Sequence, residues 1–292
     1  MFKNKTGLIN SQDLKTKPMK IAYIALTVLF LLISLIFVLP PLWTVLSSFK
    51  DVKEFIQMPP TIIPRSFHPE KLITVWNDLN FSKLYLNTLV ILVGTVVVKI
   101  SFCGLAAYVI SKMKPKGSKV IFWMIIATMM IPGQVKLVAV YKNILDFPLL
   151  HINMINTYWP LFLMGGADAF MIVVYKSFFD GIPDLLIEAA KIDGVGSFGM
   201  FSKIILPLSK SVIITSILLT MSGVWGDFFW PRMILKEKEL WNIMLAILEL
   251  KDTYPIDIQF SGLVFAIVPP IILFLFLQKH IMQGFTMSGI KG

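Results

Sequence analysis

The first candidates for chemistry in this sequence are four ionisable residues within or beside apolar runs: Lys99, Lys136, Asp168 and Asp227. A charge in an apolar environment is costly, so it commonly marks a solute or ion path. Asp168 and Asp227 could accept hydrogen bonds from the hydroxyl groups of a solute. Trp225 and Trp230, which flank Asp227, could stack on a ring of such a solute. The alternative is structural: the charges pair between helices or with the backbone, and the Trp side chains anchor the chain at a membrane surface.

The sequence lacks the residue patterns of common active and cofactor sites. Residues 194–199 match G-x-G-x-x-G, but a dinucleotide site needs this pattern between a strand and a helix of a βαβ unit. Gly117-Ser118-Lys119 lacks the earlier glycine of a Walker A motif. Cys103 lies in an apolar run and the three His are far apart, so neither indicates a disulfide framework or zinc. We therefore predict no catalytic residue, no metal ligand and no cofactor on this chain.

Composition indicates the elements that must position these residues. The 292 residues are 56% hydrophobic and 15% charged, whereas soluble domains carry about 25% charge. This excludes a disordered chain, a coiled coil and a typical cytosolic enzyme. A membrane-spanning helix needs about 20 mostly apolar residues. Six runs meet that need, at 21–49, 84–111, 120–141, 154–175, 211–231 and 259–277. The Pro40-Pro41 pair is expected to kink or end the first helix.

The net charge of +10 predicts the orientation of these spans. Segments 1–20, 112–119, 176–210 and 278–292 together hold 15 Lys and Arg against five acids. The intervening segments 50–83, 142–153 and 232–258 hold ten of each. Lys and Arg favour the cytoplasmic side, so both termini are predicted to be cytoplasmic. The excess charge then serves topology and attraction to anionic lipid, and it gives no support to nucleic-acid binding.

Cytoplasmic segment 176–210 is too apolar for a solvated loop and too charged for a span. Pro183 and Gly194 are start and stop signals, which predict a short helix over Pro183–Asp193. Leu186, Ala189 and Ala190 share one face of that helix by their spacing. We interpret the segment as a docking helix for another protein, the alternative being a helix that rests on lipid. On the other side, 50–83 is expected to be an ordered loop. The stretch WNIMLAILEL within 232–258 is interpreted as an amphipathic interfacial piece or a docking element, the alternative being a surface cap over helix ends.

The same segment resembles the EAA motif of permease subunits of ATP-binding cassette (ABC) importers. That motif reads EAA, three residues, G, nine residues, I-x-LP, and the EAAKIDG version resembles sugar-importer permeases of the maltose-permease type. The matching residues are Glu188, Ala189, Ala190, Asp193, Gly194, Ile204, Leu206 and Pro207. Further similar stretches are Asn87-Thr88, GLAAYVIS, MIPGQV, NTYWPL, WGDFFWP and GFTMSGIKG. The last of these is similar to the tail of the smaller of two paired subunits.

The resemblance implies an all-α, polytopic protein of the bacterial plasma membrane with six spans and the type I ABC importer permease fold. Residues 1–83 would form the cytoplasmic tail, first span and first external loop. Residues 84–280 would form the permease core with coupling loop 176–210, and 281–292 a cytoplasmic tail. The implied partners are a homologous permease subunit in a heterodimer, two copies of an ATPase that holds ATP and Mg, a solute-binding protein and membrane lipid. Glu188 would pair with a basic group of the ATPase.

The resemblance implies import of a sugar or oligosaccharide. Within transport, the solute could instead be a peptide, a polyol or a sugar phosphate. A lone channel or secondary transporter is a different class, but charge relays and inverted repeats are not evident. An intramembrane enzyme would need paired catalytic residues, for which Asp168 and Asp227 are the only weak candidates.

Overall fold

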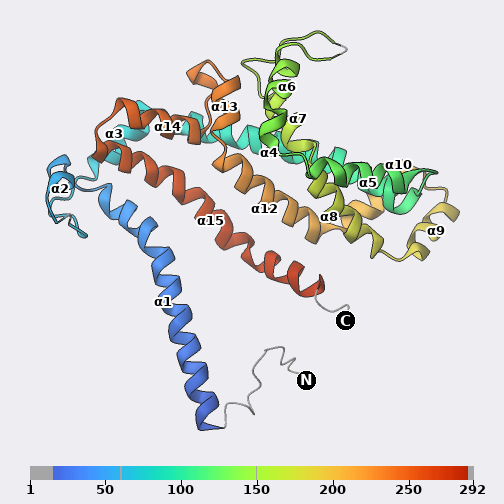
Figure 1. Ribbon diagram of the computed structural model, residues 1–292, viewed down its shortest axis with the longest axis horizontal. Coiled ribbons are helices and arrows are strands. Elements are labelled where there is room, and N and C mark those ends of the chain that lie inside the picture. Colours follow the sequence, from blue (N-terminus) through green and yellow to red (C-terminus); the bar gives the residue numbers. More distant parts are fainter. Residues whose placement is uncertain (1–15, 60, 149, 289–292) are drawn as a thin grey trace. The chain divides into compact units, whose positions relative to one another are not determined.

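The computed structural model describes residues 16–59, 61–148 and 150–288. The chain divides into two compact units (Figure 1). The smaller unit is Met1–Leu72 with Pro255–Val264, and the larger is Ile73–Tyr254 with Phe265–Gly292. The predicted tail residues 1–15 and 289–292 lie outside the described residues.

Helices make up the regular structure of the described ranges, apart from one isolated bridge between Phe147 and Ile152. The first elements are α1 (Lys17–Ser47), α2 (Val52–Ile56), α3 (Glu70–Asp78), α4 (Phe81–Tyr108) and the π-helix η2 (Val109–Met113). Next come α5 (Ser118–Met129), α6 (Gly133–Leu145), α7 (Trp159–Gly166), α8 (Ala169–Asp180) and α9 (Asp184–Ile192). They are followed by α10 (Ser197–Met200), the π-helix η3 (Phe201–Ile205), α11 (Leu206–Leu208) and α12 (Lys210–Gly226). The last are α13 (Phe229–Ile234), η4 (Lys238–Leu240), α14 (Ile243–Thr253) and α15 (Ile256–Ser288).

The described helices include three that are long and apolar enough to cross a membrane alone: Lys17–Ser47, Phe81–Met113 and Ile256–Phe276. Three bent helix pairs raise the number of spans to six if each pair is one span. The expected single helix over 120–141 is wrong in detail, because α5 and α6 meet at 103°. Pro132 stands between them and cannot donate a backbone hydrogen bond. Pro40-Pro41, by contrast, does not end α1, which continues to Ser47.

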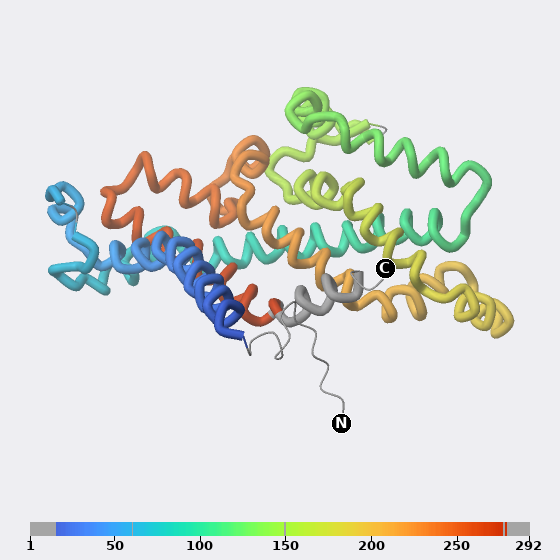
Figure 2. Tube along the Cα trace, turned by 60° about the horizontal axis from the view of Figure 1, so that its bottom comes forward, coloured from blue at the N-terminus to red at the C-terminus, as the bar shows by residue number. Residues whose placement is uncertain are grey.

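The core of the larger unit is built on α4, which packs against α7, α8 and α12 (Figures 1 and 2). Glycines allow α7 to approach α4 closely. A Cβ at Gly165 would lie 2.4 Å from Thr95 Cγ2, and one at Gly166 would lie 2.2 Å from Val98 Cγ1. Residues around the break between α7 and α8 are thereby held against the middle of α4.

Two adjacent prolines in α15 explain two hydrogen bonds to neighbouring helices. Pro269 and Pro270 lack the N–H groups that would bond the carbonyls four residues earlier, at Phe265 and Ala266. The Tyr85 hydroxyl donates to the Phe265 carbonyl at 2.7 Å, and the Trp225 indole donates to the Ala266 carbonyl at 2.8 Å. Both carbonyls are therefore satisfied by side chains from α4 and α12.

Within the larger unit, residues 239–254 fold onto α4 as a cap. Ile243, Leu245 and Leu250 of α14 are buried. The Asn87 side-chain amide donates to the Glu239 and Trp241 carbonyls, at 2.8 and 2.9 Å. These contacts favour the alternative of a cap over an interfacial piece or a docking element at WNIMLAILEL. Asn87 lies inside α4, because the helix of the second span begins at Phe81 rather than near residue 84.

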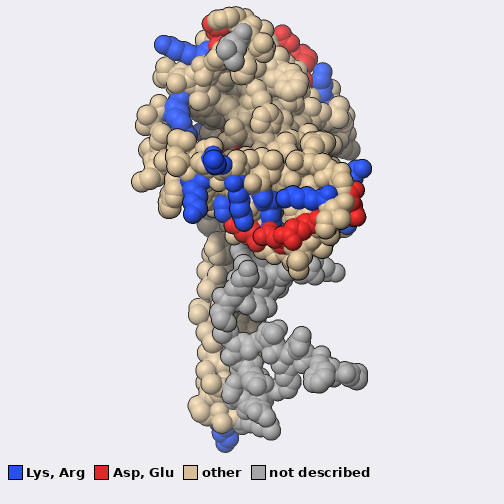
Figure 3. All heavy atoms as spheres, turned by 90° about the vertical axis from the view of Figure 1, so that its right-hand side faces the viewer, with Lys and Arg blue, Asp and Glu red and all other residues tan. Residues whose placement is uncertain are grey.

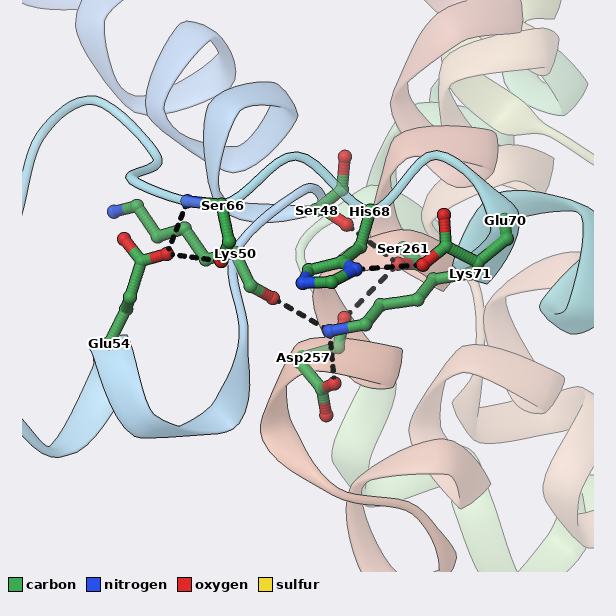
Figure 4. Close-up of polar contacts among 9 residues, drawn as sticks. All are labelled: Ser48, Lys50, Glu54, Ser66, His68, Glu70, Lys71, Asp257 and Ser261. Atoms are coloured by element: carbon green, nitrogen blue, oxygen red, sulfur yellow. Dashed lines mark hydrogen bonds and ion pairs between the residues drawn. The ribbon is translucent and has the colours of Figure 1, made fainter.

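The smaller unit contains the ordered loop that its prolines predicted, held by a polar cluster (Figure 4). The Glu54 carboxylate accepts hydrogen bonds from Thr61, from the Arg65 backbone, and from both the hydroxyl and backbone of Ser66. Burial disfavours its charge, but these four bonds outweigh burial and lower the pKa of Glu54 to about 2. Lys71 joins this loop to the start of α15 through Asp257, at 2.6 Å.

Candidate functional site

A cavity of about 440 Å³ lies in the larger unit, beside α4, α7 and α12. Its apolar wall includes Ile91, Leu161, Met164, Leu219 and Val224. Its polar wall consists of Thr95, Lys99, Asp168, Thr220, Asp227 and Asn242, with Trp230 beside them. Three of the four residues that the sequence suggested for a solute path therefore share one cavity. An apolar wall with a few polar groups is typical of a site for a small molecule.

Asp168 and Lys99 form an ion pair in the wall of this cavity. Lys99 Nζ lies 3.0 Å from Asp168 Oδ2, and the Lys99 side chain is only 8% exposed. Asp168 also accepts a hydrogen bond from the Met171 backbone through Oδ1, and so caps the start of α8. These contacts support the structural interpretation of Asp168, in which it pairs with a lysine and with the backbone. The Asp168 side chain is nevertheless 32% exposed, so it can also contact a molecule in the cavity.

The residues around Asp227 divide between the cavity and the scaffold. Asp227 Oδ1 accepts hydrogen bonds from the Phe229 and Trp230 backbones at 3.0 and 3.2 Å. These bonds fix the start of α13. Trp225 lies outside the cavity wall, where its indole satisfies the Ala266 carbonyl. Lys136 is exposed on α6.

Two threonines in the cavity wall were missed by the sequence reasoning. Thr95 and Thr220 are 1% and 3% exposed, and neither hydroxyl has a hydrogen-bond partner. A buried hydroxyl without a partner costs free energy, so it is a candidate for a ligand contact. In the sequence, the one sign of these hydroxyls is a threonine within an apolar helix. Threonines of this kind also occur in ordinary helix packing, so the sign does not identify a ligand contact. Within the described ranges, no group of three or more His, Cys, Asp or Glu could hold a metal ion.

The second candidate site is the segment from α9 to α11. The expected helix over Pro183–Asp193 is present as α9, Asp184–Ile192. Gly194 ends it with φ of +75°, a conformation that favours glycine. The segment lies at the end of the larger unit where α4 ends (Figures 1 and 2). Lys and Arg side chains gather in a band across this end (Figure 3).

The faces of α9 differ in part from the expectation. Ile187 and Ala190 are buried in a cluster with residues of α4, α8 and η3, so Ala190 packs inside the chain rather than offering a surface. Glu188, Ala189, Asp193 and Gly194 are exposed. Large apolar side chains beside them are also exposed: Leu185 at 76%, Ile192 at 86% and Phe198 at 72%. Ile204 and Leu206 pack partly against the same cluster, and Pro207 is exposed.

Apolar helices long enough to cross a membrane, a cavity with a mixed apolar and polar wall, and a short helix presented at one end are the features of a membrane permease. Residues 100–286 match the family described as binding-protein-dependent transport system inner membrane component, and the chain belongs to this family of ABC transporter permeases. It is thus a multi-pass protein of the bacterial inner membrane.

Two relatives agree with this assignment, and a solved structure shares the fold. The chain is 31% identical over 287 residues to the probable ABC transporter permease YurM of Bacillus subtilis (strain 168), covering 96% of this chain and 93% of that protein. It is 29% identical over 274 residues to the arabinooligosaccharides transport system permease AraQ of the same organism, covering 92% and 96%. The fold matches a chain from a bacterial ABC transporter that imports the acidic polysaccharide alginate. The TM-score is 0.77 at 23% identity, over 94% and 99% of the two chains.

Proposed function

We propose that this chain is one permease subunit of an ATP-driven importer that translocates a carbohydrate delivered by an external solute-binding protein. The observation that carries the proposal is the polar cavity inside the membrane-spanning unit of a chain of this family. Names of relatives add support: AraQ belongs to an arabinooligosaccharide system, and UgpE of Yersinia pestis, 27% identical, to an sn-glycerol-3-phosphate system. A sugar phosphate is therefore the second candidate solute.

The cavity would serve as part of the solute path. Asp168, Asp227 and the hydroxyls of Thr95 and Thr220 can exchange hydrogen bonds with solute hydroxyl groups. Trp230 offers a ring face of the kind on which sugars pack. The mixed donors and acceptors suit a neutral polyhydroxylated solute, because Lys99 is already paired with Asp168 and leaves little free positive charge for a phosphate.

The exposed side of α9 would bind a separate ATPase subunit. Glu188 and Asp193 offer negative charge, and Leu185 and Ile192 offer apolar area. Ile204, Leu206 and Pro207 would fix the return of the chain to α12. In this proposal, two ATPase copies bind ATP and Mg and hydrolyse the nucleotide. This chain and a homologous second permease supply the path, and both termini lie in the cytoplasm.

The test is uptake by cells that lack this chain and are complemented with it. Labelled arabino-oligosaccharide, alginate oligosaccharide and glycerol 3-phosphate are supplied separately, and the tagged chain is purified from the membranes. Restored uptake of an oligosaccharide and copurification of an ATPase are expected. Restored uptake of glycerol 3-phosphate alone would replace the carbohydrate by the second candidate. Absence of any copurifying ATPase would overturn the importer proposal.

The coupling site is tested with Glu188→Lys, and exposed Asp252 on α14 provides the matched control Asp252→Lys. Glu188→Lys is expected to reduce ATPase copurification and uptake about tenfold, since charge reversal at a contact costs on the order of 1.4 kcal/mol or more. Equal behaviour of the two variants would exclude Glu188 from the ATPase contact.

A further inference from the structure

The cytoplasmic end of α4 makes a set of polar contacts that the family motif does not include. Lys112, in the π-helix η2, places its Nζ 2.6 Å from the Ile182 carbonyl and 2.6 Å from Asp184 Oδ1. The neighbouring Ser111 hydroxyl donates to Asp180 Oδ1 at 2.5 Å. We name these contacts of Ser111, Lys112, Asp180, Ile182 and Asp184 the Lys112 clamp. It joins η2 to both sides of the turn between α8 and α9.

Burial makes this lysine unlike the other lysines of its loop. The Lys112 side chain is 4% exposed, whereas Lys114, Lys116 and Lys119 are exposed. A lysine is rarely buried unless its charge is paired, and the clamp supplies both a carboxylate and a carbonyl. The hydrogen bond and charge of Lys112 lower the pKa of Asp184, as expected for a carboxylate held beside a lysine.

The geometry of η2 directs Lys112 toward the turn before α9. A π-helical turn holds one more residue than an α-helical turn and is often found at functional sites. Lys114 then ends the helix with φ of 47°, and its N–H bonds the Val109 carbonyl. The residues 109–113 are thus fixed in the widened turn from which the clamp is made.

A second contact holds the other side of the α9–α10 segment to the same helix. Phe201 of η3 lies with its ring centroid 5.6 Å from that of Tyr108. A Cβ added at Gly104 would lie 3.2 Å from Phe201 Cζ. Lys112 therefore fixes the beginning of α9 and Phe201 fixes the chain after it, both to the last turns of α4 and η2.

The middle of the same helix lines the solute cavity. Ile91, Thr95 and Lys99 of α4 line the cavity. Lys99 and Lys112 are 13 positions apart in the sequence, which corresponds to roughly 20 Å along a helix. One continuous helical segment therefore carries both the Lys112 clamp and part of the cavity wall.

We propose that Lys112 is a positioning residue for energy coupling: it ties the start of the coupling helix to α4, so that movement of α9 moves the cavity wall. The proposal rests on the proposed function, in which α9 binds the ATPase. Lys112 itself does not touch the ATPase or the solute. Its loss leaves the ATPase bound and active but weakens the connection between α9 and α4.

The experiment compares Lys112→Met with Lys116→Met in the intact transport complex, purified with its ATPase and reconstituted with the solute-binding protein. Methionine keeps the length of the buried side chain and removes the charge. The substitution removes the two hydrogen bonds that the charged Lys112 Nζ donates, which weakens the connection between η2 and α9 substantially. We expect the solute transported per ATP hydrolysed to fall about tenfold in Lys112→Met, with the amount of bound ATPase unchanged. Lys116→Met is expected to behave as wild type.

Two further variants keep the proposal falsifiable if Lys112→Met fails to fold. Asp184→Asn removes the ion pair at a carboxylate whose side chain is 63% exposed, and it is expected to lower the same ratio to a smaller extent. Ser111→Ala removes the bond to Asp180. An unchanged transport-to-hydrolysis ratio in folded Lys112→Met, or in Asp184→Asn with Ser111→Ala, would overturn the proposal. A wild-type complex that transports without ATP hydrolysis would instead overturn the proposed function.

Discussion

Substitution of Gly166 by alanine tests the close packing that places Asp168 beside Lys99. Gly166 is the last residue of α7 and is buried against α4. The added Cβ would lie 2.2 Å from Val98 Cγ1, 3.0 Å from Val98 Cβ and 3.4 Å from the Lys99 backbone nitrogen. Because valine is stiff about χ1 and the nitrogen belongs to a helix, neither neighbour can rotate away.

The size of the effect follows from these distances. Ordinary contact begins near 3.4 Å, so α7 and α4 must separate by about 1.2 Å to remove the overlap. Overpacking of this kind costs about 1–3 kcal/mol. The matched control is Gly223→Ala on α12, in the wall of the same cavity, where an added Cβ meets nothing within 4 Å. Replacement of glycine by alanine inside a helix stabilises by about 0.5–1 kcal/mol, so the two variants should shift stability in opposite directions.

The assay is unfolding of the purified protein in detergent, at equilibrium or as a rate, with the loss of helix measured by circular dichroism. Gly166→Ala should unfold at lower temperature or denaturant concentration than wild type, and Gly223→Ala at equal or higher values. Gly166→Ala with wild-type stability would show that α7 does not approach α4 as described. Destabilisation of both variants by the same amount would refute the assignment of the effect to the Val98 contact.

Two other predictions use the ionisable groups. Asp168→Asn keeps the acceptor that caps α8 but leaves the Lys99 charge unpaired, so unfolding in detergent should show a loss of up to about 3 kcal/mol. Lys99→Met combined with Asp168→Asn should recover most of it, and a double variant no more stable than the single one would contradict the pairing. Glu54→Gln should be less stable than wild type at neutral pH. Because the pKa of Glu54 falls from an ordinary 4.5 to about 2 on folding, its stabilisation is complete above pH 4.5 and is lost as pH falls toward 2. Limited proteolysis of the loop before Arg65 across this pH range should show the two proteins converging, and a constant difference down to pH 2 would refute the cause given.

The start and end of α9 could be predicted because their signals are short-range. Pro183 and Gly194 act on their own neighbours, so the start and end of α9 fall within one residue of the expected positions. The number of apolar runs was readable for the same reason, since hydropathy is a local sum. The direction of a helix is not set by local hydropathy. The 103° turn at Met130–Pro132 lies in an apolar stretch, and an apolar stretch has the same hydropathy whether it is straight or bent.

Contacts between distant residues were not readable. Lys99 and Asp168 were each recognised as costly charges, but their pairing depends on Gly165 and Gly166, which let α7 approach α4. The packing of Ala190 inside the chain was missed because spacing defines a face of a helix without saying what covers it. Thr95 and Thr220 come together only when α4 and α12 pack.

The proline pair in α15 has a consequence for how this sequence can vary. A membrane interior has no water to bond a free carbonyl, so Pro269 and Pro270 make the Tyr85 hydroxyl and the Trp225 indole obligatory donors. The two prolines of α15, Tyr85 of α4 and Trp225 of α12 therefore depend on one another, although they lie on three helices. A chain that regains N–H groups at 269 and 270 no longer needs either aromatic donor. A chain that keeps the prolines loses the donor to the Phe265 or Ala266 carbonyl if Tyr85 or Trp225 is replaced by phenylalanine.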